Sequence, residues 1–434
     1  MNISLPIGVK YILNILHGNG YEAFVIGGCT RDAILNNIPH DWDITTNATP
    51  DVVEQLFSVT YPTGKQYGTI IVGYINNKGD QTNYEVTTFR GEQNYKDGRR
   101  PSKVWFSKKL KNDVKRRDFT INQIAYNENG FIDYYNGIRD LNNKILRTVG
   151  NPYKRFKEDY LRLIRALRFA AKYGLIIEKQ TTKAIHKLFT KENLKHISVE
   201  RIHDEIIKMT PYIIKNKYIQ YEFQQELKIL YGNSCNLYLV SDNSYVCLAG
   251  WYKDIPSLAT QPSDILNRLR YSTNEKKLIC KLQKCIFKAV NSRTGEYLIT
   301  QDKLTNKYYI LKKNLYLFRQ LFYKVDINTT KLMIEVLWLC CHINFNMDLK
   351  SFTLQMLKFI DEQLKNCKKI HIDGNYIKIN FNVQDKIIGD ILNKCEQYIL
   401  ENPDKNTQKD LHEFVYKYME ALHETNSTRE YIWN

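Results

Sequence analysis

One stretch of the sequence, FVIGGCTRDAILNNIPHDWDITT from Phe24 to Thr46, restricts most strongly how this chain can fold. Its apolar start is typical of a strand, the pair Gly27 and Gly28 lets the backbone approach a ligand closely, and the residues that follow can begin a helix. Free amide groups at a helix start favour an anion, and Arg31 would add a forked donor for phosphate groups. The stretch therefore predicts a strand, a glycine turn and a helix that together hold a phosphate.

Two aspartates, Asp41 and Asp43, end this stretch in HDWDITT. On a strand, positions i and i+2 project from the same face, so the two carboxylates could bridge a pair of divalent cations of the kind that assist phosphoryl transfer. Glu85, in the predicted strand YEVTTF, is a candidate third acid. An acidic strand end would look the same, and Glu85 also fits an exposed strand residue. The glycines and the Arg-Asp pair upstream favour the metal interpretation.

The pattern of apolar residues changes near residue 150. Before it, apolar runs such as residues 23–26, 69–72 and 84–89 alternate with glycine turns, which is typical of strands mixed with short helices. After it, apolar residues recur every three or four positions, which predicts helices. The sequence therefore predicts an α+β head with helical domains behind it, divided as residues 1–150, 151–210, 211–325 and 326–434.

The charge balance indicates a polyanionic partner. The chain has 63 Lys plus Arg against 46 Asp plus Glu, a formal net charge of +17. Such a field favours nucleic acid over a membrane surface. A solvated, lysine-rich surface explains the lysine excess equally well, but it explains the arginine clusters less well.

Cysteine spacing and hydropathy bear on the compartment. The nine cysteines show neither CxxC pairs for zinc nor the spacing of a small disulfide scaffold. The most apolar late stretch, residues 332–341, is about half of the ~20 residues that a membrane helix needs, and the N-terminus lacks the layout of a signal peptide. We therefore expect a soluble, cytoplasmic protein with reduced thiols and no membrane partner.

Residues 157–174, KEDYLRLIRALRFAAKYG, predict a helix that could recognise a base. Apolar residues recur on one side of it, while Glu158, Asp159, Arg162 and Arg165 lie on the other, with Arg168 on the flank. Asp159 and Arg162, one turn apart, could present an acceptor beside a donor fork to the Watson–Crick edge of cytosine or adenine. An intrahelical salt bridge on a solvated face is the alternative. Three arginines without matching acids favour a phosphate-rich ligand.

A further basic stretch, VKRRDFTINQIAYN, covers residues 114–127. Arg116 and its neighbour Arg117 would serve as phosphate contacts. Asp118 is the candidate N-cap of a helix that would follow.

Together these motifs resemble those of class II tRNA nucleotidyltransferases, the CCA-adding enzymes, which share their head with bacterial poly(A) polymerases. The resemblance is strong across residues 20–210 and diffuse beyond them. The matching segments are GGCTRDAIL with HDWDITT (27–46), PTGKQYGT (62–69), EVTTFR (85–90), RRDFTINQIAYN (116–127), GIRDLNNKILRTVGNP (137–152), EDYLRLIRALRFA (158–170) and ERIHDEIIKM (200–209).

The resemblance implies a nucleotidyltransferase head with a mixed sheet, followed by a helical neck, body and tail. It implies that Asp41 and Asp43 hold two Mg²⁺ ions and act in catalysis, whereas Glu85 remains a candidate third catalytic acid from its strand position alone. It also implies tRNA as the partner, held by its acceptor and TΨC arms in the body and tail, and no protein partner. The positions implied to bind CTP and ATP are Gly28, Arg31, Arg116, Asp159, Arg162, Arg165 and Arg168.

The expected activity is therefore template-independent addition of CCA to the 3′ end of tRNA, with release of pyrophosphate. The segment from Arg90 to Phe106 matches a flexible loop that CC-adding members lack, which disfavours CC-only activity. An A-adding enzyme or a poly(A) polymerase is the alternative within the class. Outside it stand a non-catalytic RNA-binding protein and a nucleotidyltransferase of small molecules, which would need neither the Asp159 and Arg162 pair nor a long basic helical tail.

Overall fold

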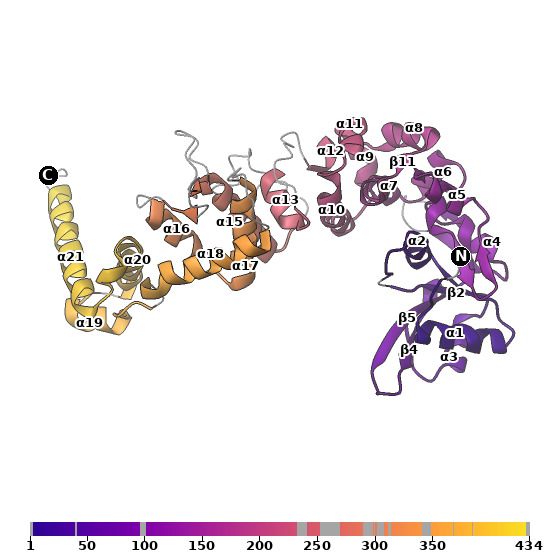
Figure 1. The fold of residues 1–434 in the computed structure, drawn as a ribbon, viewed down its shortest axis with the longest axis horizontal. Coiled ribbons are helices and arrows are strands. Elements are labelled where there is room, and N and C mark those ends of the chain that lie inside the picture. Colours follow the sequence, from indigo (N-terminus) through magenta and orange to yellow (C-terminus); the bar gives the residue numbers. More distant parts are fainter. Residues whose placement is uncertain are drawn as a thin grey trace. The chain divides into compact units, whose positions relative to one another are not determined.

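The computed structural model describes residues 3–39, 41–95, 101–231, 241–251, 270–289, 298, 300–301, 308–310, 314–340, 349–367, 369–383 and 385–430. The chain divides into two compact units (Figure 1). Unit 1 comprises residues 1–235 and 264–271, and unit 2 comprises residues 236–263 and 272–434. The predicted division into four domains is a finer one and stays a prediction.

A seven-stranded mixed sheet forms the centre of the head, as predicted. Its strand order is β3-β4-β5-β2-β1-β8-β9. β2 and β5 pair in parallel, and the other neighbours pair antiparallel. The strands are β1 (Ala23–Ile26), β2 (Ile44–Thr46), β3 (Thr60–Gly64), β4 (Thr69–Ile75), β5 (Gln81–Thr88), β8 (Ala125–Asn127) and β9 (Gly130–Ile132).

Helices cover both faces of this sheet, and the alternation along β1 shows how. Ala23 and Val25 belong to the apolar cluster on the side of α1 and α3, whereas Phe24 and Ile26 belong to the cluster on the side of α4. β1 is therefore buried on both faces. The helices of the head are α1 (Ile7–Gly18), α2 (Gly28–Ile34), α3 (Pro50–Leu56), α4 (Leu110–Lys115) and α5 (Gly137–Asn142).

The segment predicted as a flexible loop contributes a separate hairpin, β6 (Arg90–Tyr95) with β7 (Pro101–Phe106). The part of the predicted loop at residues 96–100 lies outside the described residues. Antiparallel pairing joins Arg90 to Phe106 and Gly91 to Trp105. The hairpin's base therefore follows directly on β5.

Seven helices complete the described part of unit 1. They are α6 (Pro152–Glu158), α7 (Leu161–Tyr173), α8 (Lys179–Leu188), α9 (Lys191–Leu194), α10 (Val199–Ile213), α11 (Lys217–Glu222) and α12 (Gln224–Tyr231). A short parallel pair, β10 (Ile145–Leu146) with β11 (Ile176–Ile177), lies beside them. The predicted apolar stripe is confirmed, because Leu163, Ile164 and Leu167 on α7 are fully buried.

The prediction of a single helix over residues 157–174 is wrong. α6 ends at Glu158, α7 begins at Leu161, and Asp159 between them has an extended backbone with φ −151° and ψ 105°. The Asp159 carboxylate accepts a hydrogen bond from the backbone N–H of Leu161 at 3.1 Å. A side chain that bonds the backbone two residues on competes with helix formation, so the chain bends here.

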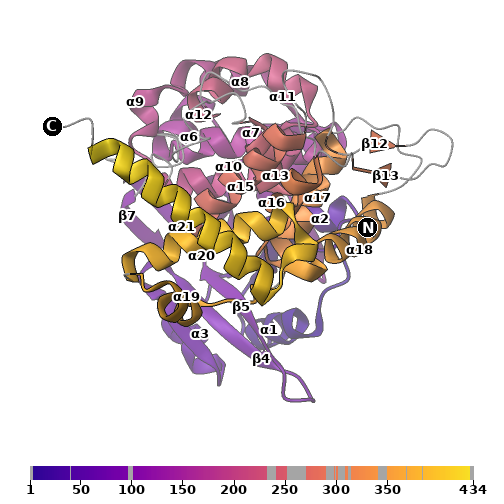
Figure 2. The same cartoon turned by 90° about the vertical axis from the view of Figure 1, so that its left-hand side faces the viewer.

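Unit 2 is built almost entirely from helices (Figure 2). They are α13 (Ser244–Trp251), α15 (Thr273–Ala289), α16 (Leu315–Phe322), α17 (Ile327–Cys340), α18 (Leu349–Leu364), α19 (Gly374–Phe381), α20 (Asp385–Glu401) and α21 (Gln408–Glu430). One small antiparallel pair, β12 (Thr300–Gln301) with β13 (Tyr308–Tyr309), is also described. A single apolar cluster runs through these helices and includes Phe318, Phe352 and Ile391. The predicted α+β class with a helical remainder is therefore confirmed.

Candidate active site

The aspartate pair lies at the edge where β2 begins. The strand starts at Ile44, so Asp41 and Asp43 precede it rather than lie on it, which corrects the prediction of two strand positions. Asp43 is still tied to the sheet, because its carbonyl accepts a hydrogen bond from the N–H of Ile26 at 3.0 Å. Both aspartate side chains are exposed. The pair is thus anchored by backbone and open to a ligand.

Glu85 approaches the aspartates through strand register. Val86 pairs with Ile44 in the parallel ladder, which sets the preceding residues Glu85 and Asp43 beside each other. Close packing raises the pKa of Asp43, the charges of Glu85 and Asp41 raise it further, and Arg117 opposes them. The site therefore concentrates negative charge that a cation would relieve.

These donors suit Mg²⁺ held jointly with water and phosphate. Among the described residues, no group of three His, Cys, Asp or Glu side chains could hold a metal ion by itself. Glu85 therefore does not complete a three-acid metal cluster with Asp41 and Asp43. Mg²⁺ commonly uses one or two carboxylates and takes its remaining ligands from water and substrate phosphates, so an open aspartate pair fits it.

The glycine turn brings the phosphate-binding backbone to the same place. Gly27 has a φ of +96°, which favours glycine. A methyl group on Gly27 would lie 3.3 Å from Nη1 of Arg117 and 3.6 Å from Oδ2 of Asp43. Gly28 then begins α2, as the sequence predicted. Turn, aspartate and guanidinium therefore converge without a side chain between them.

Arg117, more than Arg116, faces the aspartates. Both guanidiniums hold the buried carboxylate of Asp113, Arg116 through Oδ1 at 2.7 Å and Arg117 through Oδ2 at 3.2 Å. Burial alone would raise the pKa of Asp113, but the two arginines outweigh it and hold the pKa below its ordinary value. Nε of Arg117 is buried without a hydrogen-bond partner among the described residues. The Arg117 atom that lies beside the glycine turn and Asp43 is Nη1.

Arg31 is not the open fork that the sequence suggested. Its side chain is buried and donates to Asp32 at 3.0 Å, to Asn122 at 2.5 Å and to the hydroxyl of Tyr173 at 2.6 Å. Its guanidinium also lies over the ring of Phe169, 5.1 Å from the centroid. Arg31 therefore connects the head to α7, and its partners could not be read from local sequence.

Phe169 gathers three of the predicted nucleotide-binding arginines. The guanidinium carbons of Arg31, Arg165 and Arg168 lie 5.1, 5.1 and 4.2 Å from its ring centroid. The ring is 4% exposed. Cations are attracted to an aromatic face within about 6 Å of its centroid, so one buried ring helps to hold three positive charges together.

The arginines of α7 have acidic partners, which corrects the expectation that they had none. Arg165 donates to Asp118 at 2.7 Å, and Arg168 donates to Glu205 of α10 at 2.5 Å. Burial would raise the pKa of Asp118, but Arg165 and a hydrogen bond from Asn122 hold it well below its ordinary value. Asp118 is not a helix N-cap either, since only a short 3₁₀ turn follows, beginning at Thr120.

Asp159 and Arg162 lie at one junction but do not pair with each other. Asp159 accepts from Arg201 of α10 at 2.8 Å, whereas Arg162 donates to Glu158 at 2.9 Å. Arg162 also donates to the backbone carbonyl of Arg116 at 2.9 Å. The intrahelical Asp159–Arg162 salt bridge that competed with base recognition is therefore not formed. Both residues are held in place by other groups.

The sequence interpretation missed three positions that shape this site: Arg117 as the arginine beside Asp43, Phe169 as the shared ring, and α10 as the source of counterions. ERIHDEIIKM had been matched only as a motif, yet Arg201 and Glu205 are four residues apart, on one helical face. That charge spacing was the available signal. Nothing in the local sequence identified Phe169 as a ring shared by three arginines.

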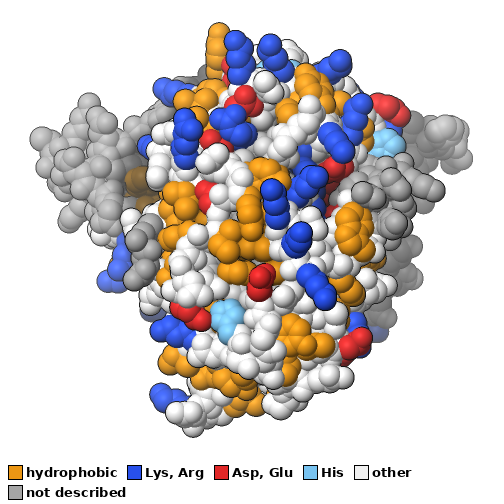
Figure 3. Space-filling model, turned by 90° about the vertical axis from the view of Figure 1, so that its right-hand side faces the viewer, with side chains coloured by type: hydrophobic (Ala, Val, Ile, Leu, Met, Phe, Trp, Pro, Cys, Tyr) orange, Lys and Arg blue, Asp and Glu red, His pale blue; other side chains and the backbone are white. Residues whose placement is uncertain are grey.

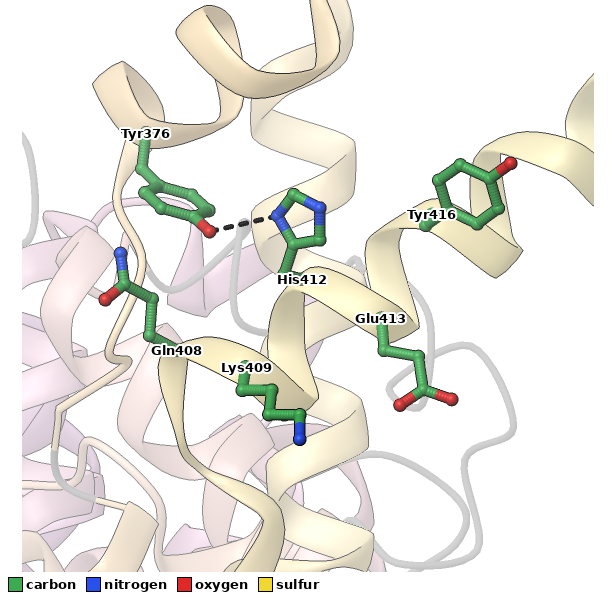
Figure 4. A pocket seen from close by; sticks show the side chains of 6 residues that line it. All are labelled: Tyr376, Gln408, Lys409, His412, Glu413 and Tyr416. Atoms are coloured by element: carbon green, nitrogen blue, oxygen red, sulfur yellow. Dashed lines mark hydrogen bonds between the residues drawn. The ribbon is translucent and has the colours of Figure 1, made fainter.

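A cavity of about 520 Å³ in unit 2 holds none of the predicted catalytic residues (Figure 4). Its lining comes from α19 and α21, and the hydroxyl of Tyr376 lies 2.9 Å from Nδ1 of His412. None of the seven cysteines that the structure describes is in a disulfide. No helix within the described segments is long and apolar enough to cross a membrane.

Two family models match unit 1. Residues 23–147 match the model described as the poly A polymerase head domain. Residues 174–210 match the one described as "Probable RNA and SrmB- binding site of polymerase A". The first range contains the aspartate pair and the glycine turn, and the second contains α8 and most of α10.

Curated relatives and solved structures agree with these matches. The CCA-adding enzyme of Staphylococcus haemolyticus is 33% identical over 422 residues, which cover 94% of this chain and 96% of the relative. A Staphylococcus aureus CCA-adding enzyme is 45% identical over 210 residues, covering 48% of this chain and 51% of the relative.

Among solved structures, the Bacillus stearothermophilus CCA-adding enzyme in complex with CTP gives a TM-score of 0.69 at 22% identity, covering 96% of this chain and 98% of that one. At that identity the likeness shows a shared fold. The Staphylococcus haemolyticus relative is similar along almost its whole length, so its similarity extends through both units. The chain therefore belongs to the CCA-adding enzymes, nucleotidyltransferases that add CCA to the 3′ end of tRNA using CTP and ATP.

Proposed function

We propose that CCA addition by this chain takes place where Asp41, Asp43 and the Gly27 turn meet. The observation that supports this proposal most strongly is that Asp43, the Gly27 turn and Arg117 converge within a few ångströms. Among the described residues, Nε of Arg117 has no hydrogen-bond partner. A buried donor without a partner is costly. A triphosphate placed beside Gly27 would satisfy it.

Two Mg²⁺ ions are the proposed cofactor, held by Asp41 and Asp43. When bound there, such ions stabilise negative charge on the attacking and leaving oxygens of the transfer. The chain's own part is to position and to neutralise. Arg117 contacts the phosphates, the start of α2 at Gly28 offers backbone amides, and Glu85 adds negative charge beside Asp43.

The base of CTP or ATP is proposed to lie against α7. Asp159 supplies the acceptor for an exocyclic amine and Arg162 supplies the donor fork, each kept in place by a neighbour on α10 or α6. Arg31, Arg165 and Arg168, gathered on Phe169, add positive charge for the nucleotide. Arg116 completes the predicted nucleotide-binding set, although it faces the aspartates less directly than Arg117 does. The solved enzyme from Bacillus stearothermophilus was captured with CTP.

The partner is tRNA, gripped through its acceptor and TΨC arms. The solved Thermotoga maritima enzyme, with a TM-score of 0.57, was captured with tRNA. The net charge of +17 supports contacts to the RNA backbone. Recognition by shape and backbone suits a protein that must accept every tRNA.

Extension assays test this function. Three tRNAs, ending at the discriminator base, at C and at CC, are incubated with CTP alone, ATP alone and both. Full CCA addition predicts that CTP extends the first two and ATP the third. Extension of only the CC-ended tRNA by ATP would instead show an A-adding enzyme. Addition of long runs of A to all three tRNAs would instead show a poly(A) polymerase.

The Asp43→Ala and Asp41→Ala variants test the metal site. Each should lose transfer by at least about a thousandfold, roughly 4 kcal/mol of transition-state stabilisation, and should still bind tRNA. Near-normal turnover in both would refute the assignment.

A further inference from the structure

A cavity in unit 1, about 1090 Å³ in volume, lies between the β6–β7 hairpin, α4 and α6. Arg116 and Glu158 form part of its wall, whereas Asp41, Asp43 and Arg117 do not line it. The neighbours Arg116 and Arg117 hold the two oxygens of the same carboxylate, Asp113. The cavity is therefore next to the aspartate pair but separate from it.

Three lysines give this cavity a positive rim. Lys115 at the end of α4 and Lys154 and Lys157 on α6 are all exposed and line it. None of them forms an ion pair with an acid among the described residues. The two acids in the wall are already engaged, Glu92 with Arg90 at 3.0 Å and Glu158 with Arg155 at 2.6 Å. The positive charge of the lysines is therefore left for an anionic ligand.

Aromatic rings lie within the same cavity. Tyr135 and Tyr153 are partly exposed, and Trp105 is 36% exposed. A methyl group on Gly91 would lie only 2.2 Å from the Trp105 ring, so the indole packs flat against a position that only glycine allows. A lysine rim around exposed rings is the combination that binds unpaired RNA, since lysines contact phosphates and rings stack on bases.

The basic surface continues from the cavity onto α8. This helix packs against α6, and Nζ of Lys187 lies 5.9 Å from the ring centroid of Tyr153. α8 also falls within residues 174–210, the range that matches the RNA-binding model. Figure 3 shows many Lys and Arg side chains spread over one face of the molecule, among apolar side chains and fewer acids. The surroundings of the cavity therefore favour RNA as its anionic ligand.

We propose that this cavity binds an unpaired stretch of the RNA substrate, with Lys115, Lys154 and Lys157 on its phosphates and Tyr153 and Trp105 against its bases. The stretch is the single strand next to the growing 3′ end, because the cavity wall at Arg116 is one residue from the arginine that faces Asp43. The identity of this RNA as tRNA rests on the proposed function. The binding itself does not.

A matched pair of double variants tests the rim. Lys154→Ala/Lys157→Ala removes two rim charges, and Lys10→Ala/Lys78→Ala removes two exposed lysines from α1 and the β4–β5 turn of the same unit. Binding of a tRNA that lacks CCA is measured without nucleotides over a range of salt. The rim variant should bind about tenfold more weakly, and its slope of log K against log salt should shrink by about 1.4, or ~0.7 for each lost single-strand contact. The control should change either quantity far less.

Tyr153→Leu tests stacking separately from charge. It should weaken RNA binding by at least about fivefold without changing the salt slope, because one base loses its ring partner. A thermal melt of each variant establishes that unit 1 stays folded. Equal binding by the rim variant, the control variant and the unmodified protein would overturn the proposal.

Two further outcomes are distinguishable. If CTP displaces a short unpaired RNA from the unmodified protein but not from Asp43→Ala, the displacement occurs at the aspartate pair and the cavity stays an RNA site. If CTP binding itself falls tenfold in the rim variant, the cavity holds free nucleotide and the proposal is wrong. Retained transfer by Asp43→Ala would refute the proposed metal site while leaving the rim result unchanged.

Discussion

The interiors of units 1 and 2 are built in different ways. In unit 1 the acids Asp113, Asp118 and Glu205 are buried and each meets one or more arginines. In the described part of unit 2, ion pairs such as Lys417–Glu413 lie at the surface, and the interior is a continuous apolar cluster. Unit 1 thus adds buried ion pairs to its apolar clusters, whereas the described interior of unit 2 is mainly apolar.

This difference indicates what each interior is for. Replacing a buried ion pair by apolar residues is often neutral or stabilising, so such pairs are poor evidence of stability. In unit 1 they hold arginines at defined places around Phe169 and Asp43, where a ligand of opposite charge is proposed to bind. Our hypothesis is that unit 1 exchanges stability for a fixed array of positive charge, while unit 2 has no such constraint.

The largest expected effect comes from Asp118→Ala. The substitution removes the buried partner of Arg165, whose side chain is 31% exposed and keeps only Glu205 at 3.8 Å; breaking a fully buried pair typically costs about 3–5 kcal/mol, which is the upper bound here. The free energy of unfolding should fall by up to that amount in chemical denaturation, and nucleotide transfer should be lost. As a control within unit 2, Lys417→Ala should leave the denaturation midpoint almost unchanged, because its pair with Glu413 is exposed to solvent.

The same pair gives a pH dependence with a definite sign. The folded-state pKa of Asp118 lies below its unfolded value, so its contribution is fully present above the unfolded pKa of about 3.9 and disappears as pH falls through the folded value. Asp118→Asn should therefore lose more stability at neutral pH than at acid pH. An Asp118→Asn penalty that stays constant from pH 7 to about pH 3 would contradict the assignment.

Phe169→Leu should have an intermediate effect, on binding more than on folding. Leucine fills much of the space but lacks the aromatic face that attracts Arg31, Arg165 and Arg168. We expect the KM for CTP and ATP to rise about fivefold or more with a smaller change in kcat. Phe169→Tyr should restore the KM, because the ring is kept. A loss of stability with unchanged KM would assign Phe169 to packing alone.

In unit 2, Tyr376→Phe should have a small effect. It removes the hydrogen bond between the tyrosine hydroxyl and His412, which is 2.9 Å long, and a typical bond of this kind contributes about 1 kcal/mol. Denaturation should show a loss of that size, with kcat at saturating tRNA unchanged. A fall in kcat would show that the charged interior of unit 1 is not the only part that sets the catalytic rate.

The sequence predicted those features that depend on neighbours along the chain. The strand at residues 23–26, the start of α2 at Gly28 and the apolar stripe of α7 follow from local periodicity, and the structure contains all of them. The strand expected from the run 84–89 is also present, as β5 (Gln81–Thr88). The errors concern partners from elsewhere. Asp159 pairs with a residue 42 positions away and Arg165 with one 47 positions away. Helical spacing offered Asp159 and Arg162 as partners, because periodicity carries no information on which distant helix packs alongside.

Cys29 should give the smallest effect of all, and it contrasts the two units again. Burial raises the pKa of its thiol to about 11, and the negative charge of Asp43 contributes to the rise. Because the thiolate is the reactive form, only about one molecule in a thousand would carry it at pH 8. Iodoacetamide at that pH should leave transfer activity intact, although Cys29 lies directly after the glycine turn. Mass spectrometry should find the partly exposed Cys280 of unit 2 alkylated well before Cys29. Rapid inactivation with Cys29 labelled first would show that the buried start of α2 beside Asp43 opens readily to solvent, and the contrast between a fixed unit 1 and a merely packed unit 2 would then fail.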